Sequence, residues 1–195
     1  MKAKYELKDL MNVAIFVVLY YVAFFIGMCF GYIPVLMGVL SLFTGLLSGI
    51  PFMLFLTKVK KPGMILLFAA VCGLISLAMG SGVWPLITAL IAGLLCELMV
   101  RAMKYQPSAK MVLVHAAFSL WSIGFGMRLY LASFDSYRQS LVENYGEEYV
   151  AEMLQSVSGM GFWGTMAITL IGGVLGGLLG YAVFKKHFRK ISSKA

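Results

Sequence analysis

The segment TLIGGVLGGLLGY, residues 169–181, places five glycines within nine positions of an apolar run. On a helix these glycines form two adjacent rows at a spacing of four residues: Gly172, Gly176 and Gly180, and Gly173 and Gly177. Glycine lowers the stability of an isolated helix by about 1 kcal/mol per residue relative to alanine, so such rows need a compensating contact. In a membrane, small residues at this spacing let another helix backbone approach closely. The segment therefore predicts a tightly packed transmembrane helix.

The composition of the whole chain agrees with a membrane location. Of 195 residues, 61% are hydrophobic and only 12% are charged, against about 25% in ordinary soluble domains. Six apolar runs approach the ~20 residues that a spanning helix needs. They are residues 10–30, 35–56, 64–79, 83–100, 111–132 and 162–184. We predict an all-α membrane protein with one domain, residues 1–195, and six transmembrane helices. The third run is the shortest, and a partly re-entrant segment is the alternative there.

The basic residues predict how the chain is oriented. Fourteen of the 16 lie before the first run, between the second and third, between the fourth and fifth, or after the sixth. These are Lys2, Lys4, Lys8, Lys58, Lys60, Lys61, Arg101, Lys104, Lys110, Lys185, Lys186, Arg189, Lys190 and Lys194. Because Lys and Arg concentrate in cytoplasmic loops, we expect both termini to be cytoplasmic and the protein to lie in the cell membrane. The short juxtamembrane clusters also account for the net charge of +8, which argues against nucleic acid as a partner.

One polar segment, residues 133–160, separates the fifth and sixth runs on the predicted outer side. Within it, residues 140–157 repeat apolar side chains every three to four positions, with acidic residues between them, which predicts an amphipathic helix. We expect Gly159 and Gly161 to end this helix before the last span. Two interpretations stay open: the helix connects two spans, or it is a lid over an outer cavity.

Few charges lie within the spans. Glu97 and Arg101 are four residues apart near the end of the fourth run, which suits a structural ion pair. Arg128, near the outer end of the fifth run, either extends to the interface or binds the anionic group of a ligand, since guanidinium pairs with carboxylate or phosphate. Arg128 is our first candidate for ligand binding.

Motifs for catalysis are missing from the sequence. There is no nucleotide-binding G-x-x-x-x-G-K-[ST], no H-E-x-x-H, no G-x-S-x-G and no metal-ligand spacing of His, Cys or acidic residues. We expect no enzymatic activity, no resident cofactor or metal and no hydrolysis of ATP by this chain. The three cysteines, Cys29, Cys72 and Cys96, are too scattered for a disulfide framework.

The stretches KDLMNVAIFVVLYYVAFFIG (8–27) and GSGVWPLITALIAGLLCELMVRAMKY (80–105), together with the glycine-rich last span, resemble one known family. They are similar to substrate-binding S-components of energy-coupling-factor (ECF) transporters, within the group labelled Trep_Strep or MptS-like. The resemblance implies a pocket built from spans four to six and the outer loops. It also implies docking onto a transmembrane T-subunit that is driven by two partner ATPases, which hydrolyse the ATP.

In this family the docking surface includes an A-x-x-x-A pattern in the first span. Here Ala14 is followed by Val18, so docking uses a variant surface or the glycine row of the sixth span supplies it: Gly172, Gly176 and Gly180.

The resemblance points to haem as the transported ligand, or otherwise to a vitamin. For haem, Arg128 or Arg138 would meet a propionate and Met28 or Tyr32 would be axial to the iron. Stacking residues would be Tyr32, Trp84, Tyr130, Tyr145 and Tyr149. A flavin-, biotin- or folate-like ligand would need the same combination of aromatic rings and one cation. The alternatives are a scaffold or assembly protein without a ligand and an independent carrier of a small solute.

Overall fold

The structure, a computed structural model, describes residues 5–106, 108–131 and 134–192. All regular elements in these residues are helices. The apolar ones are α1 (Leu7–Met28), α2 (Leu40–Leu56), α3 (Met64–Ala78), α4 (Trp84–Ala102), α5 (Met111–Ser119), α6 (Ile123–Gly126) and α8 (Glu147–Ser192). Short 3₁₀ turns are η1 (Cys29–Tyr32), η2 (Pro34–Val39), η3 (Leu120–Ser122) and η4 (Met127–Tyr130), and α7 (Phe134–Tyr145) is the polar helix. The all-α fold class is confirmed.

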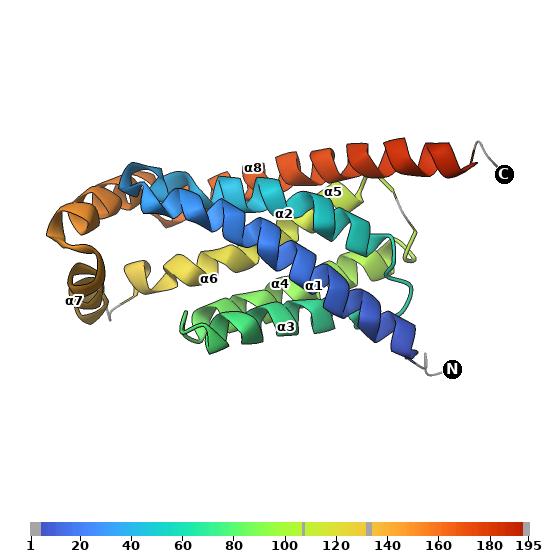
Figure 1. The fold of residues 1–195 in the computed structure, drawn as a ribbon, viewed down its shortest axis with the longest axis horizontal. Coiled ribbons are helices and arrows are strands. Elements are labelled where there is room, and N and C mark those ends of the chain that lie inside the picture. Colours follow the sequence, from blue (N-terminus) through green and yellow to red (C-terminus); the bar gives the residue numbers. More distant parts are fainter. Residues whose placement is uncertain (1–4, 107, 132–133, 193–195) are drawn as a thin grey trace.

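The helices form an elongated bundle with the described ends of the chain at one end and α7 at the other (Figure 1). We call these the terminal end and the α7 end. The basic residues Lys58, Lys60 and Lys61 lie in the α2–α3 loop, and Lys104 and Lys110 in the α4–α5 loop. Lys2, Lys4 and Lys194 of the predicted basic clusters lie outside the described residues.

Five helical segments are long and apolar enough to cross a membrane: Leu7–Tyr32, Pro34–Leu56, Trp84–Ala102, Met111–Tyr130 and Glu147–Lys186. The predicted third span is α3, with 15 residues. At 1.5 Å per residue it extends about 22 Å, which is less than the ~30 Å of a bilayer's hydrocarbon core. The five long spans agree with the prediction, and the third is shorter than a standard span.

Helices α2 and α8 pack backbone against backbone through their glycines. A Cβ added to Gly49 would lie 2.1 Å from the carbonyl carbon of Gly176, and one added to Gly176 would lie 2.2 Å from the carbonyl oxygen of Gly45. An added Cβ would also clash at the other two positions of this row: at Gly172 with Leu42, and at Gly180 with Gly49 and Met53. Only a residue without a side chain fits at these positions.

The second glycine row faces α5. A Cβ on Gly173 would lie 2.6 Å from Ser119 Oγ, and one on Gly177 would lie 3.1 Å from the Cα of Val112. Both rows are therefore covered within this chain. In this conformation the face of α8 that carries Gly172, Gly176 and Gly180, predicted as a docking surface, is not available to another subunit because α2 occupies it.

An aromatic cluster fills the bundle between α1, α2, α3 and α5. Its fully or almost fully buried members are Tyr20, Phe24, Phe52, Phe55, Phe68, Phe118 and Trp121. The Phe52 and Phe118 rings stack at 4.4 Å between centroids, and Trp121 Nε1 donates a hydrogen bond of 2.7 Å to the Tyr20 hydroxyl. Buried Met53, Leu56, Met64, Ile65 and Val100 continue this core toward the terminal end. Buried apolar side chains thus extend from the aromatic cluster toward the terminal end.

Glu97 stabilises the start of α3 and does not pair with Arg101. Its carboxylate accepts a 3.1 Å hydrogen bond from the backbone N–H of Ile65 and one of 3.1 Å from the Tyr105 hydroxyl. The first N–H groups of a helix lack partners within the helix, and a carboxylate also suits the positive end of the helix dipole. No ion pair in the described part of the chain joins Glu97 to Arg101, so the predicted pair is replaced by a helix cap.

The amphipathic helix predicted over 140–157 is divided in the structure. Gly146 has φ +86° and separates α7 from α8, so the chain turns at a position where glycine is strongly favoured. The predicted break at Gly161 is present, since this residue has φ +64° and ψ 176° inside α8. Gly159, in contrast, is helical. Between the two breaks, Val150, Met153 and Val157 are buried while Glu148 and Glu152 are exposed.

We predict that Gly176→Ala lowers the free energy of unfolding of the detergent-purified protein by about 1–3 kcal/mol, because the new methyl group would separate α2 from α8. The matched control is Gly159→Ala in the same helix, where an added Cβ meets nothing within 4 Å. This control should be neutral or slightly stabilising. Equal thermal unfolding midpoints for the two variants would contradict the close packing of α2 and α8.

Candidate functional site

A cavity of about 470 Å³ opens between the helices and is lined in part by α7. Its walls come from the end of α1 with η1, the start of α2 with η2, the α3–α4 turn, the η3–η4 region, α7 and the first half of α8. Cavities that bind small molecules typically measure about 300–1,000 Å³. No aspartate, glutamate, lysine or histidine is among the lining residues, and Arg128 is their only charged member.

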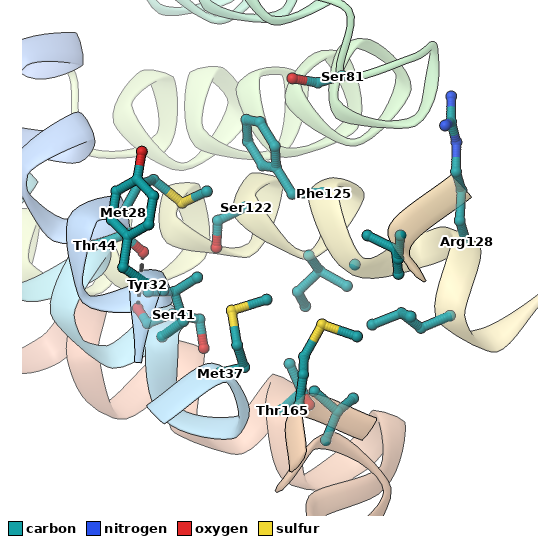
Figure 2. Close-up of a pocket in the computed structure, with 18 of the residues that line it drawn as sticks. Met28, Tyr32, Met37, Ser41, Thr44, Ser81, Ser122, Phe125, Arg128 and Thr165 are labelled. Carbon is teal, nitrogen blue, oxygen red and sulfur yellow. Dashed lines mark hydrogen bonds between the residues drawn. The ribbon is translucent and has the colours of Figure 1, made fainter. Parts of the chain in front are cut away.

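Six of the seven predicted ligand-binding residues line this cavity: Met28, Tyr32, Arg128, Tyr130, Tyr145 and Tyr149. They come from segments more than 100 positions apart in the sequence. Figure 2 shows Arg128 on the opposite side of the cavity from Met28 and Tyr32. A ligand that contacted both sides would have to extend across the cavity.

The tyrosines have different surroundings. The Tyr130 hydroxyl is 3.0 Å from Thr165 Oγ1, and the Tyr149 hydroxyl donates to the Gly31 carbonyl. These two bonds tie α8 to η4 and to η1 and thereby shape the cavity wall. Tyr145 stacks on Tyr149 at 5.2 Å, whereas the Tyr32 side chain is 76% exposed.

The polar segment before the last span forms one wall of the cavity. Tyr137 and Leu141 of α7 and Tyr149, Met153 and Val157 of α8 line it. Ser156 fastens this wall to η2: its hydroxyl accepts from the Gly38 N–H at 3.0 Å and donates to the Val35 carbonyl at 2.7 Å. Of the two interpretations of this segment, a cover over a cavity agrees with the structure better than a simple connection.

Trp84 does not line the cavity, and no other α4 residue does. This corrects the expectation that span four contributes to the pocket. The reason is the close contact of α4 with α6: a Cβ on Gly124 would lie 2.3 Å from Thr88 Oγ1 and 2.6 Å from the Cα of Pro85. With α4 sealed against α6, spans one and two take its place in the wall. Arg138, the other candidate for an anionic group, pairs with Glu147.

Several lining residues escaped the sequence analysis. They include the hydroxyl groups of Ser41, Thr44, Ser122 and Thr165 in apolar helical segments, that of Ser81 in the α3–α4 turn, and the side chains of Met37 and Phe125. Serine and threonine are common packing residues in membrane helices, so their presence alone does not mark a site. Ser41 Oγ is buried and has no hydrogen-bond partner in the described structure.

The described His, Cys, Asp and Glu side chains form no group of three or more that would hold a metal ion. Sulfur donors at the cavity are Met28, Cys29, Met37 and Met153, with the Tyr32 phenol beside them. An iron-containing ligand would therefore meet thioether, thiol or phenol groups here.

The fold and the cavity define a class: an integral membrane protein whose helical bundle is packed at one end and hollow at the other. The particular family follows from a comparison of sequences. Residues 7–190 match the family described as a hypothetical bacterial integral membrane protein (Trep_Strep), and the chain belongs to this family. No curated protein and no solved structure matches the chain.

The different exposure of the three cysteines gives a test of the cavity and of the core. Cys29 is exposed and lines the cavity, while Cys72 and Cys96 are buried. We predict that a maleimide labels one cysteine in the folded, detergent-purified protein and three after denaturation, with the fast site mapped to Cys29 by mass spectrometry. Cys29→Ser should abolish the fast labelling. Comparable labelling of Cys72 or Cys96 in the folded protein would show that the aromatic core is open.

Proposed function

We propose that this protein is the substrate-binding subunit of an ECF-type ABC importer. It would capture a small nutrient from outside the cell and deliver it by docking onto a transmembrane T-subunit, with the energy supplied by two partner ATPases. The observation that carries this proposal is the cavity of about 470 Å³ with a single cation, closed toward the terminal end by the aromatic core.

The packed core argues for capture and against free passage. A channel needs an open path that continues past its binding site. Here an aromatic group lies between the cavity and the terminal end. Its members are almost completely buried and contact one another: Tyr20, Phe52, Phe118 and Trp121. The sequence also lacks a motif for nucleotide binding. A protein of this kind binds a solute and relies on others to move it.

The charge distribution supports the orientation of this receptor. Two groups of basic residues, Lys58, Lys60 and Lys61 and then Arg101, Lys104 and Lys110, flank the terminal end, where the positive-inside rule assigns the cytoplasm. Of the arginines and lysines that the structure describes, Arg128 and Arg138 are the two at the cavity end. In this orientation both termini are cytoplasmic and the cavity opens to the outside.

The lining chemistry favours an anionic ligand with an apolar or aromatic body. Arg128 would bind the anionic group, while Phe125 and the tyrosines would contact the body. Haem fits this description through its propionates, with Met28 or Tyr32 near the iron. A vitamin with one carboxylate or phosphate is the other candidate.

We propose that the first span, α1, supplies the surface that docks onto the T-subunit. Ala14 and Val18 are exposed on α1, Val18 at 61%, and a row of exposed apolar side chains continues along this face. That face is open to lipid or to a T-subunit, unlike the glycine rows of α8.

The competing proposals are a scaffold protein without a ligand and an independent solute carrier. The scaffold is disfavoured by the cavity, since a protein that only holds others together has no need for a hollow lined by one cation and several aromatic rings. Genes for a T-subunit and paired ATPases beside this one would favour capture over both alternatives.

The test is a thermal-shift screen of haem and water-soluble vitamins against the detergent-purified protein. We expect one of these compounds to raise the unfolding midpoint, because a ligand that binds only the folded state stabilises it. Arg128→Gln should weaken binding of that compound roughly 10-fold to 100-fold, which corresponds to about 1.5–3 kcal/mol for a charged hydrogen bond.

Leu98→Ala is a suitable control, because Leu98 is exposed on α4, away from the cavity. It should leave binding unchanged. The capture proposal fails, and the scaffold interpretation is favoured, if no compound in the screen shifts the thermal unfolding midpoint and the protein co-purifies with other membrane proteins.

A further inference from the structure

The guanidinium of Arg128 is seated against the backbone of Gly82 in the α3–α4 turn. A Cβ added to Gly82 would lie 2.1 Å from Arg128 Nη2 and 3.0 Å from its Cζ. Gly82 also has φ +82°, in the left-handed region. A side chain at position 82 would therefore be strained by the backbone conformation, and its Cβ would displace the Arg128 guanidinium.

A second element holds the same group from α7. The Cζ of Arg128 lies 5.4 Å from the centre of the Tyr137 ring, within the range of a cation–π contact. The arginine side chain therefore extends from η4 and ends between the α3–α4 turn and α7. Figure 2 shows it reaching toward the connection that carries Ser81.

Arg128 has no anionic partner among the residues that the structure describes. The ion pairs in the described part of the chain involve Lys61 and Arg138 only, and no hydrogen bond from Arg128 to a described residue is present. The cavity lining contains no carboxylate. A half-buried, positioned guanidinium with free N–H donors matches a carboxylate or phosphate in both charge and geometry.

We propose that Gly82 and Tyr137 position Arg128 as an oxyanion-binding subsite in the wall of the cavity, and that Gly82 is a residue on which selection for anionic ligands depends. The subsite binds the carboxylate or phosphate group of a solute entering the cavity. This inference rests on the proposed capture function and adds to it the residue that fixes where the anion binds.

The neighbouring Gly80 supplies a matched control. It lies in the same turn with φ +84°, but a Cβ at this position meets nothing within 4 Å. Gly80→Ala and Gly82→Ala therefore carry the same kind of backbone strain. Only Gly82→Ala displaces the guanidinium, so a difference between the two variants reports on Arg128 and not on the stability of the turn.

The first experiment needs no nutrient. Purified wild-type protein, Gly80→Ala and Gly82→Ala are treated with phenylglyoxal in maltoside detergent, and modification of Arg128 is followed by mass spectrometry. We expect Arg128 to react several-fold faster in Gly82→Ala than in the other two proteins, because the added methyl group displaces its guanidinium from the contact with residue 82. Inorganic phosphate should slow the reaction several-fold in the wild type and Gly80→Ala but not in Gly82→Ala. Equal rates in all three would overturn the positioning role, and no effect of phosphate would overturn the oxyanion subsite.

A lipid phosphate is the other source of the same chemistry. If phosphatidylcholine nanodiscs without any solute protect Arg128 as fully as phosphate does in detergent, the subsite belongs to a lipid headgroup and the solute assignment is wrong. Protection that appears only when phosphate is added in nanodiscs supports the solute.

The second experiment compares haemin with its neutral dimethyl ester. Gly82→Ala should bind haemin at least 10-fold more weakly than the wild type, with less than a 2-fold change for the ester. Gly80→Ala, whose added methyl group would lie in the cavity wall, should affect haemin and the ester equally. Equal losses for haemin and the ester would overturn the selection for anions. If the wild type binds neither compound, haem is excluded as the proposed cargo, while the phenylglyoxal rates still decide the position of Arg128.

Discussion

The direct backbone contact between α2 and α8 is the constraint on which the rest of the structure depends. Gly45 and Gly49 on one helix face Gly172, Gly176 and Gly180 on the other without intervening side chains. In lipid no hydrophobic effect drives helices together, so dispersion between closely packed surfaces must hold them. This contact brings α8 near enough for its second glycine row to reach α5, and three helices are fixed at once.

The cavity is a consequence of where this contact ends. Past its glycine rows, toward α7, α8 changes direction at Gly161, and the preceding segment crosses to η2, where Ser156 holds it. The bundle is therefore tight around the aromatic core and open beyond it. Tyr130 and Thr165 connect the two regions by joining η4 to α8 at the cavity wall.

The sequence predicted the parts of this structure that depend on local pattern. Apolar run length located the membrane helices, and an arginine near a span end together with interfacial tyrosines predicted six residues that line the cavity. The partner of the glycine rows could not be predicted, because the same spacing serves an internal contact and an external one. Trp84 was misplaced because its surroundings depend on the contact of Gly124 with α4. Gly82 carried no signal, since its role appears only when Arg128, 46 positions later, is brought beside it.

Transport by the purified chain alone is the most direct test of the central claim that this protein is a passive receptor. Proteoliposomes containing only this polypeptide would be incubated with radiolabelled haem or vitamins, and the solute bound and the solute released into the lumen would be measured separately. Our account predicts saturable binding without entry above protein-free liposomes. Concentrative uptake in the absence of any ATPase or T-subunit would contradict it.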